Sequence, residues 1–153
     1  TSTLHVNSGA VLKSDGDMIL RSEATSKNHV SSRATNILND TDSQQRANIA
    51  IAYSNTKAVS AAIVDSAVDI TANKFELTSV GNKDISTSAA GASFSAGTLG
   101  TAVSISKSTS DIKSNLSGNI KANSIKVTSK TNIERIKTSS SASVGNGYVY
   151  KRL

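Results

Sequence analysis

Hydrophobic and polar residues alternate along much of this chain with a period of two, and one alternating block occurs twice. The block is Ile70–Ser79, ITANKFELTS, and its second copy is Ile120–Ser129, IKANSIKVTS. Five of the ten positions are identical, and Phe75 and Leu77 are replaced by other apolar residues. Because the two copies lie 50 residues apart without a gap, the sequence favours a repeat array over a fold built around one central core.

A looser copy of the block occurs earlier in the chain. It spans Leu12–Ser22, LKSDGDMILRS, with Met18 in the place of Phe75, and the residues 15–17 within it are typical of a turn. The spacing of the three copies predicts imperfect repeats of about fifty residues.

Each repeat is predicted to be a string of short β-strands, because β-branched residues alternate with polar ones between runs of Asn, Gly, Ser and Asp. The Ala-rich stretch Ala47–Ala62 would favour helix on propensity alone. The alternation of Ile49, Ile51 and Tyr53 has a period of two, however, and favours strand. The expected strands are 49–54, 59–64, 68–70, 74–79 and 84–88 in one repeat, and 101–106, 110–116, 119–120, 124–129 and 133–138 in the next.

Such strands are typical of an all-β parallel solenoid, in which successive coils stack on one another. With roughly 20 residues per coil, each repeat would supply two or three coils. Asn73 and Asn123 each precede a strand, so we expect turns with left-handed backbone there and hydrogen bonds between stacked Asn side chains. The positions expected to point into the solenoid are Ile70, Phe75, Leu77, Ile120, Ile125 and Val127.

Two polar or glycine-rich stretches interrupt the alternation. Residues 39–43 form a polar break that predicts a loop outside the regular body. Gly91, Gly97 and Gly100 predict a place where neighbouring coils approach closely.

Motifs for catalysis or metal binding are weak in this sequence. The absence of Cys excludes disulfides and Cys-ligated metals, and neither His5 nor His29 has a flanking ligand motif. Ser54–Lys57 and Ser104–Lys107 fit the S-x-x-K pattern, but its companion elements are absent. We therefore expect no enzymatic activity, no cofactor and no metal site.

The chain is interpreted as a single solenoid, residues 1–153, cut from a longer protein, because it begins with Thr1. No apolar run approaches the roughly 18 residues of a membrane span, so no transmembrane segment is expected.

Positive charge is concentrated in residues 101–153, which hold nine Lys and Arg against two acidic residues. Alternation predicts that many of these side chains point outward, and Lys126, Lys130 and Lys137 are the candidate binding residues. Their partners would be anionic glycans or phospholipid headgroups, whereas nucleic acid is not expected because few aromatic residues could stack on bases. The alternative is a solvated face that keeps the protein soluble.

Several blocks together resemble a known family. ITANKFELTS, IKANSIKVTS, NKDISTSAAGASFSAG and TAVSISKSTSDIKSNLSGNI are similar to repeats of filamentous-haemagglutinin-like exoproteins, above all the leukotoxin-type filamentous adhesins of fusobacteria. The resemblance spans most of 48–138 and, more weakly, 11–32. It implies a right-handed parallel β-helix, export across the outer membrane, and a role in adhesion or host-cell damage. It assigns no functional residue.

The expected function is therefore that of a structural and adhesive segment of a large secreted or surface-exposed bacterial adhesin or cytotoxin. Its partner would be a host-cell surface protein, glycan or lipid. One alternative is a carbohydrate-active β-helix enzyme, which would need converging carboxylates. The nearest such set is Asp65, Asp69, Glu76 and Asp84. A second alternative is a segment of a phage fibre, which would form an obligate trimer.

Overall fold

The described part of the chain consists of β-strands and their connections. A computed structural model describes residues 1–36, 47–93, 99–144 and 148–150. These residues contain no helix, and so no helix that could cross a membrane. The strands are β1 (Ser2–Val6), β2 (Val11–Lys13), β3 (Met18–Asn36), β4 (Ala47–Val64), β5 (Asp69–Thr71), β6 (Lys74–Ser93), β7 (Leu99–Leu116), β8 (Asn119–Lys121), β9 (Ser124–Val144) and β10 (Tyr148–Tyr150).

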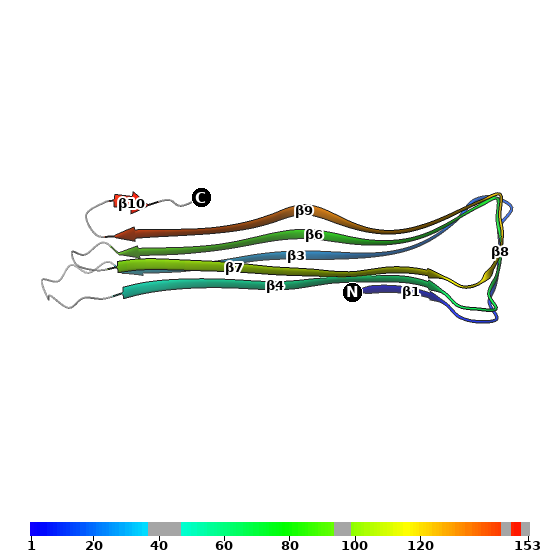
Figure 1. Cartoon of the computed structure of the whole chain (residues 1–153), viewed down its shortest axis with the longest axis horizontal. Helices are drawn as coiled ribbons and strands as arrows, with labels where there is room; N and C mark the ends of the chain where they lie inside the picture. Colours follow the sequence, from blue (N-terminus) through cyan, green and yellow to red (C-terminus); the bar gives the residue numbers. More distant parts are fainter. Residues whose placement is uncertain (37–46, 94–98, 145–147, 151–153) are drawn as a thin grey trace, which may run out of the picture. The chain divides into compact units, whose positions relative to one another are not determined.

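The strands form three sheets, which the chain visits in turn (Figure 1). The sheet orders are β1-β4-β7, β2-β5-β8 and β3-β6-β9, and β10 is added antiparallel to the outer edge of β9. We call β1-β2-β3 the first coil, β4-β5-β6 the second coil and β7-β8-β9 the third coil. Parallel pairing joins β1 to β4, and β5 to both β2 and β8. The fold is all-β with parallel sheets, which is compatible with the predicted β-solenoid.

The pairing of strands follows the sequence repeat. Ile70 of β5 lies opposite Leu12 of β2 on one side and opposite Ile120 of β8 on the other. The two copies of the block are thus direct neighbours in the stack, and the prediction of two or three coils per repeat is wrong. The predicted short strands 49–54 and 59–64 are parts of the single strand β4. Strands β6, β7 and β9 likewise run through breaks that the sequence predicted.

Contacts between Cα atoms divide the chain into two compact units. Unit 1 contains Thr1–Lys27, Lys57–Asp84 and Thr109–Glu134, and unit 2 contains Asn28–Thr56, Ile85–Ser108 and Arg135–Leu153. Each unit therefore takes one part from every coil. The predicted loop at residues 39–43 lies outside the described residues.

The apolar core of unit 1 belongs to the second coil. Its buried members are Ala62, Val64, Val68, Ile70, Phe75 and Leu77, and partly buried residues of the first and third coils pack against them. Burial of Ile70, Phe75 and Leu77 confirms the prediction for these positions. The prediction is wrong for Ile125 and Val127, which remain 50% and 46% exposed. The reason is that the third coil is the outermost in the stack, so no further described coil covers it.

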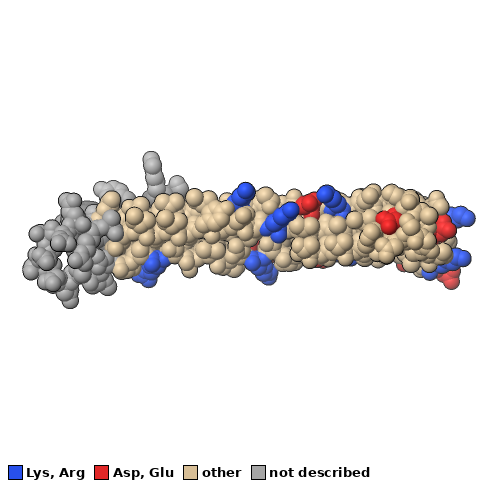
Figure 2. All heavy atoms as spheres, turned by 90° about the horizontal axis from the view of Figure 1, so that it is seen from below, with Lys and Arg blue, Asp and Glu red and all other residues tan. Residues whose placement is uncertain are grey.

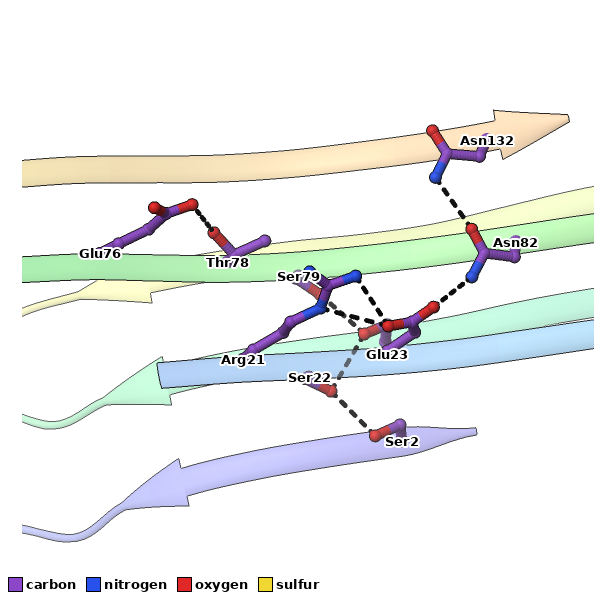
Figure 3. Close-up of polar contacts among 10 residues, drawn as sticks. Ser2, Arg21, Ser22, Glu23, Glu76, Thr78, Ser79, Asn82 and Asn132 are labelled. Atoms are coloured by element: carbon purple, nitrogen blue, oxygen red, sulfur yellow. Dashed lines mark hydrogen bonds and ion pairs between the residues drawn. The ribbon is translucent and has the colours of Figure 1, made fainter. Parts of the chain in front are cut away.

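Four serine hydroxyls cross the interior of unit 1 and link its two long sheets. Three of these residues, Ser2, Ser22 and Ser79, are labelled in Figure 3. Ser79 of β6 donates to Ser60 of β4 at 2.9 Å, and Ser60 donates to Ser22 of β3 at 3.0 Å. Ser22 in turn donates to Ser2 of β1 at 3.0 Å. Ser22, Ser60 and Ser79 are all buried, and each hydroxyl is satisfied by its neighbour.

The interior of unit 2 is built from smaller and more polar side chains. Its apolar cluster consists of Ala50, Ala52 and Ala89, with Val30, Ala34 and Ala102 at its margin. Buried Ser54 accepts a hydrogen bond from the Asn28 amide at 3.0 Å, and the Thr87 and Ser106 hydroxyls lie 2.8 Å apart.

Glycine permits close approach of the facing strands of unit 2. A Cβ atom at Gly91 would overlap the carbonyl oxygen of Thr101, and one at Gly100 would lie 2.7 Å from the carbonyl oxygen of Gly91. The predicted close contact at Gly91 and Gly100 is thereby confirmed, whereas Gly97 lies outside the described residues.

Candidate functional site

A column of polar side chains crosses all three coils of unit 1 at the turn before the third strand of each coil. The Asn73 Nδ2 donates to Oδ1 of Asp17 at 3.0 Å, and the Asn123 Nδ2 donates to Oδ1 of Asn73 at 2.9 Å. Backbone bonds run alongside, from Asn73 N to the Gly16 carbonyl and from Asn123 N to the Asn73 carbonyl, both at 2.9 Å. We call Asp17, Asn73 and Asn123 the turn column.

The turn column confirms the predicted hydrogen bonding between stacked Asn residues but not the predicted backbone. Among the described residues other than glycine, the left-handed region is occupied by Ala67, with φ of 60°, and not by Asn73 or Asn123. Asn therefore suits these turns because its side-chain amide can donate one hydrogen bond and accept another along the stack, as that of Asn73 does.

A second column has the same chemistry and lies on the sheet that contains β3, β6 and β9. The Asn132 Nδ2 donates to Oδ1 of Asn82 at 2.9 Å, and the Asn82 Nδ2 donates to Oε1 of Glu23 (Figure 3). We call Glu23, Asn82 and Asn132 the strand column. A shorter pair repeats the pattern where Asn119 donates to Asp69 at 3.2 Å.

Every one of these bonds points in the same direction. The side chain of the later coil donates its amide N–H, and the side chain of the earlier coil accepts. At the first coil both columns end in carboxylates, which accept hydrogen bonds and cannot donate when ionised. At the third coil they end in the Oδ1 atoms of Asn123 and Asn132, to which no described residue donates.

Cationic side chains flank both carboxylates. The Arg21 guanidinium donates to Oε2 of Glu23 through Nε at 3.2 Å and Nη2 at 2.7 Å. The Lys74 ammonium lies 3.9 Å from Oδ2 of Asp17. All four side chains are largely exposed to solvent, so these ion pairs contribute little stability.

The outer edge of the third coil in unit 1 exposes apolar side chains. Ile125, Val127 and Ile133 are 50%, 46% and 61% exposed, whereas Phe75 and Leu77, the counterparts of the first two, are buried. β7 and β8 end their sheets, and β10 pairs with β9 only over residues 142–144 of unit 2. We call this surface, with Asn123 and Asn132 on it, the third-coil edge.

The three lysines predicted to bind a partner all lie on β9. Lys126 is 3.5 Å from Oε1 of Glu76, and both Lys126 and Lys130 belong to unit 1. Lys137 belongs to unit 2, so the structure does not place it relative to the other two. Figure 2 shows Asp and Glu side chains next to some of the Lys and Arg side chains on the face that it presents. Binding by these lysines stays a prediction.

Glu76 combines several interactions. Its Oε1 accepts a hydrogen bond from the Thr78 hydroxyl at 2.8 Å, which lowers the pKa of Glu76, and the nearby Lys126 ammonium lowers it further. The other carboxylates of the predicted acidic set have partners of their own. Asp65 is 2.9 Å from Nε2 of His5, and Asp69 accepts from Asn119. The described residues hold no group of three or more His, Asp or Glu suited to a metal ion.

A shallow hollow of about 400 Å³ lies over the outer face of the β2-β5-β8 sheet in unit 1. Two rows of paired residues line it, one formed by Val11, Asp69 and Asn119 and the other by Lys13, Thr71 and Lys121, with Ile70 beneath. No described acidic side chain forms an ion pair with either lysine of the second row, although the Asp69 carboxylate lines the same hollow. Sequence reasoning missed Lys13, although its pairing with Lys121 through Thr71 follows from the repeat.

In comparisons with known protein families, with curated proteins and with solved structures, the chain matches none of them.

Proposed function

We propose that this chain is a structural and adhesive segment of a large secreted or surface-exposed bacterial adhesin or cytotoxin. In this proposal the coils wind as a right-handed β-helix from repeats of about fifty residues. The observation that carries it is the stacking of the repeated block on itself, with Ile70 opposite Ile120 and Asn73 bonded to Asn123. The repeats serve to build coils, which is how elongated surface proteins gain length.

The proposed partner is an anionic glycan or phospholipid headgroup on the host cell, bound by lysines of the third coil. Lys130 and Lys137 are exposed, and no described carboxylate forms an ion pair with them, so their ammonium groups are available to a ligand. Lys126 is shared with Glu76. The Lys13–Thr71–Lys121 row is a second place where the same chemistry is available.

The test measures binding of the protein to heparin and to vesicles containing anionic lipid, at low and at physiological salt. We expect Lys130→Glu to weaken binding several-fold, while Lys27→Glu, an equal charge change on the first coil, has a smaller effect. Salt should weaken binding of the wild type, because the screening length falls to about 8 Å at physiological ionic strength. Equal effects of the two variants would refute a specific role for the third coil.

Adhesion itself is tested with labelled protein on cultured host cells, with excess unlabelled protein as competitor. Saturable binding that the unlabelled protein displaces supports the proposal. Release of reducing sugars from polysaccharides by the purified protein, without such binding, would instead favour the carbohydrate-active enzyme.

A further inference from the structure

The hollow over the β2-β5-β8 sheet of unit 1 holds two rows of outward-facing side chains that differ in charge. Each strand of this sheet has three residues, so its first and third side chains face outward while the middle one packs inward. The first residues of the strands form one row and the third residues form the other, roughly 7 Å apart along the strands. We call Val11, Asp69 and Asn119 the acidic row, and Lys13, Thr71 and Lys121 the basic row.

The basic row can surround one anionic group with donors. Lys13 and Lys121 lie on either side of Thr71, so their Cα atoms are about 10 Å apart, at roughly 4.8 Å per strand. Both ammonium groups sit on long flexible stems that can turn towards a group above the Thr71 hydroxyl. Among the residues that the structure describes, none forms an ion pair with either lysine or a hydrogen bond with that hydroxyl.

The acidic row instead needs donors from a ligand. The Asp69 Oδ1 accepts a hydrogen bond from the Asn119 Nδ2 at 3.2 Å. The Oδ2 of Asp69 and the Oδ1 of Asn119 are two further acceptors, and no described residue donates to them. Val11, which is 58% exposed, adds an apolar surface to the same row.

Neither a bare anion nor a neutral sugar matches both rows. Sulfate or phosphate suits the basic row, but the Asp69 carboxylate at roughly 7 Å repels it, within the screening length of about 8 Å. A sugar with one carboxylate matches both rows, because its carboxylate accepts from the basic row while its hydroxyls donate to the acidic row. Its C–H groups suit Val11, and the hollow of about 400 Å³ has the size of a small-ligand pocket.

We propose that this hollow binds a carboxylated sugar unit of an anionic glycan. The carboxylate of the sugar lies between Lys13 and Lys121 above Thr71, and its hydroxyls donate to Asp69 and Asn119. Asp69 is then the residue that favours a carboxylated, hydroxylated ligand over sulfate or phosphate. This inference rests on the proposed adhesive function, for which it names the class of glycan and a contact in unit 1.

The test follows backbone amide shifts of isotope-labelled protein by nuclear magnetic resonance at neutral pH and constant ionic strength. The three probes are sodium glucuronate, glucose and sulfate, of which glucose has the sugar hydroxyls without the carboxylate. We expect saturable shifts at the residues of both rows with glucuronate. Glucuronate should bind at least several-fold more tightly than glucose or sulfate.

Two variants and a matched control separate the roles of the rows. Lys121→Gln should weaken glucuronate binding several-fold, whereas Lys27→Gln, which removes an equal charge from exposed surface of the first coil, should not change it. Asp69→Asn should lower the preference for glucuronate over sulfate several-fold. The reason is that sulfate, with two charges, gains more from the loss of repulsion, while the glucuronate hydroxyls lose a charged acceptor. The amide spectra check that each variant is folded.

Three outcomes would overturn the proposal. They are sulfate binding as tight as that of glucuronate, glucuronate shifts that Lys121→Gln leaves unchanged, and an Asp69→Asn variant with the same preference as the wild type. Cell binding separates this proposal from the adhesive function on which it rests. A protein that binds host cells without binding glucuronate would refute the carboxylated sugar and leave adhesion standing, whereas glucuronate binding at the hollow without cell binding would refute adhesion.

Discussion

Leu77→Ala and Val127→Ala shorten side chains at equivalent positions of the repeat, one in the second coil and one in the third. Leu77 is 0% exposed and Val127 is 46% exposed. Truncating a buried leucine leaves a cavity and costs about 2–5 kcal/mol. Val127→Ala removes two methyl groups worth roughly 0.8 kcal/mol each when fully buried, so at half exposure we expect a loss of about 1 kcal/mol or less.

The assay is urea unfolding followed by far-ultraviolet circular dichroism, from which the free energy of unfolding and its dependence on urea are obtained. Ile19→Ala is the control, because Ile19 is 64% exposed on the first coil and its loss should be equally small. The comparison holds where the urea dependence is unchanged among the variants. A loss at Val127 as large as that at Leu77 would refute the reasoning, since it would mean that the third-coil edge is covered in solution.

Asn73→Ala removes two hydrogen bonds of the turn column and should cost about 1–3 kcal/mol of unfolding free energy, whereas Asn123→Ala removes one and should cost about 0.5–1.5 kcal/mol. Gly91→Ala should cost about 1–3 kcal/mol of unfolding free energy, because the added methyl group overlaps the facing strand. Gly16→Ala should cost much less in the same urea titration, because the nearest atom to its added methyl group, Oγ of Ser14, is 3.9 Å away. Burial lowers the pKa of Lys83 below 10.5, so charging it opposes folding at neutral pH. The free energy of unfolding of the wild type minus that of Lys83→Met should therefore rise as pH rises from the folded-state pKa of Lys83 towards 10.5. A difference that does not change over this pH range would contradict the reasoning.

The register of the second and third coils could be predicted from the sequence because the repeat has no gap. Identical residues at Ile70 and Ile120 pack at the same height in neighbouring coils, so aligning the copies also aligns the strands. The same reasoning predicted that Asn73 and Asn123 would stack. That the copies lie in directly neighbouring coils was not predicted, because a coil of roughly 20 residues was assumed, which would place two or three coils in each repeat.

The length of the strands could not be predicted, because polar residues were taken as breaks. Ser54 and Thr56 lie within β4 and point into unit 2, where both are buried. Ser54 accepts from Asn28, and Thr56 donates to the Lys107 carbonyl at 3.4 Å. A buried hydroxyl that finds a partner on another strand can lie within a strand without being left unsatisfied, but the sequence does not show that partner.

The ends of the polar columns were also missed. Residues 15–17 were taken as a turn, yet Asp17 occupies the position that Asn73 and Asn123 occupy later. The exchange of Asn for Asp at one repeat position is visible in the sequence. The consequence of this exchange is that Asp17 only accepts a hydrogen bond in the turn column. That consequence follows from the direction of the hydrogen bonds, which is seen only when the three coils are stacked.

The chain of buried serine hydroxyls in unit 1 allows a last prediction about how such groups act together. Ser60 lies in its middle, accepting from Ser79 and donating to Ser22. Ser60→Ala leaves the buried Ser79 hydroxyl without an acceptor and Ser22 without a donor. Leaving a buried polar group unsatisfied costs about 1–3 kcal/mol, so we expect a loss of that size.

Replacing Ser22, Ser60 and Ser79 together with alanine removes the buried hydroxyls as a set and leaves none of the three unsatisfied. Because replacing both partners of a hydrogen bond by apolar groups can be nearly neutral, the triple variant should lose no more stability than Ser60→Ala alone. Urea unfolding of the single, double and triple variants measures this coupling directly. A triple variant whose loss equals the sum of the three single losses would mean that each hydroxyl contributes independently, because its partners are then satisfied by water rather than by one another.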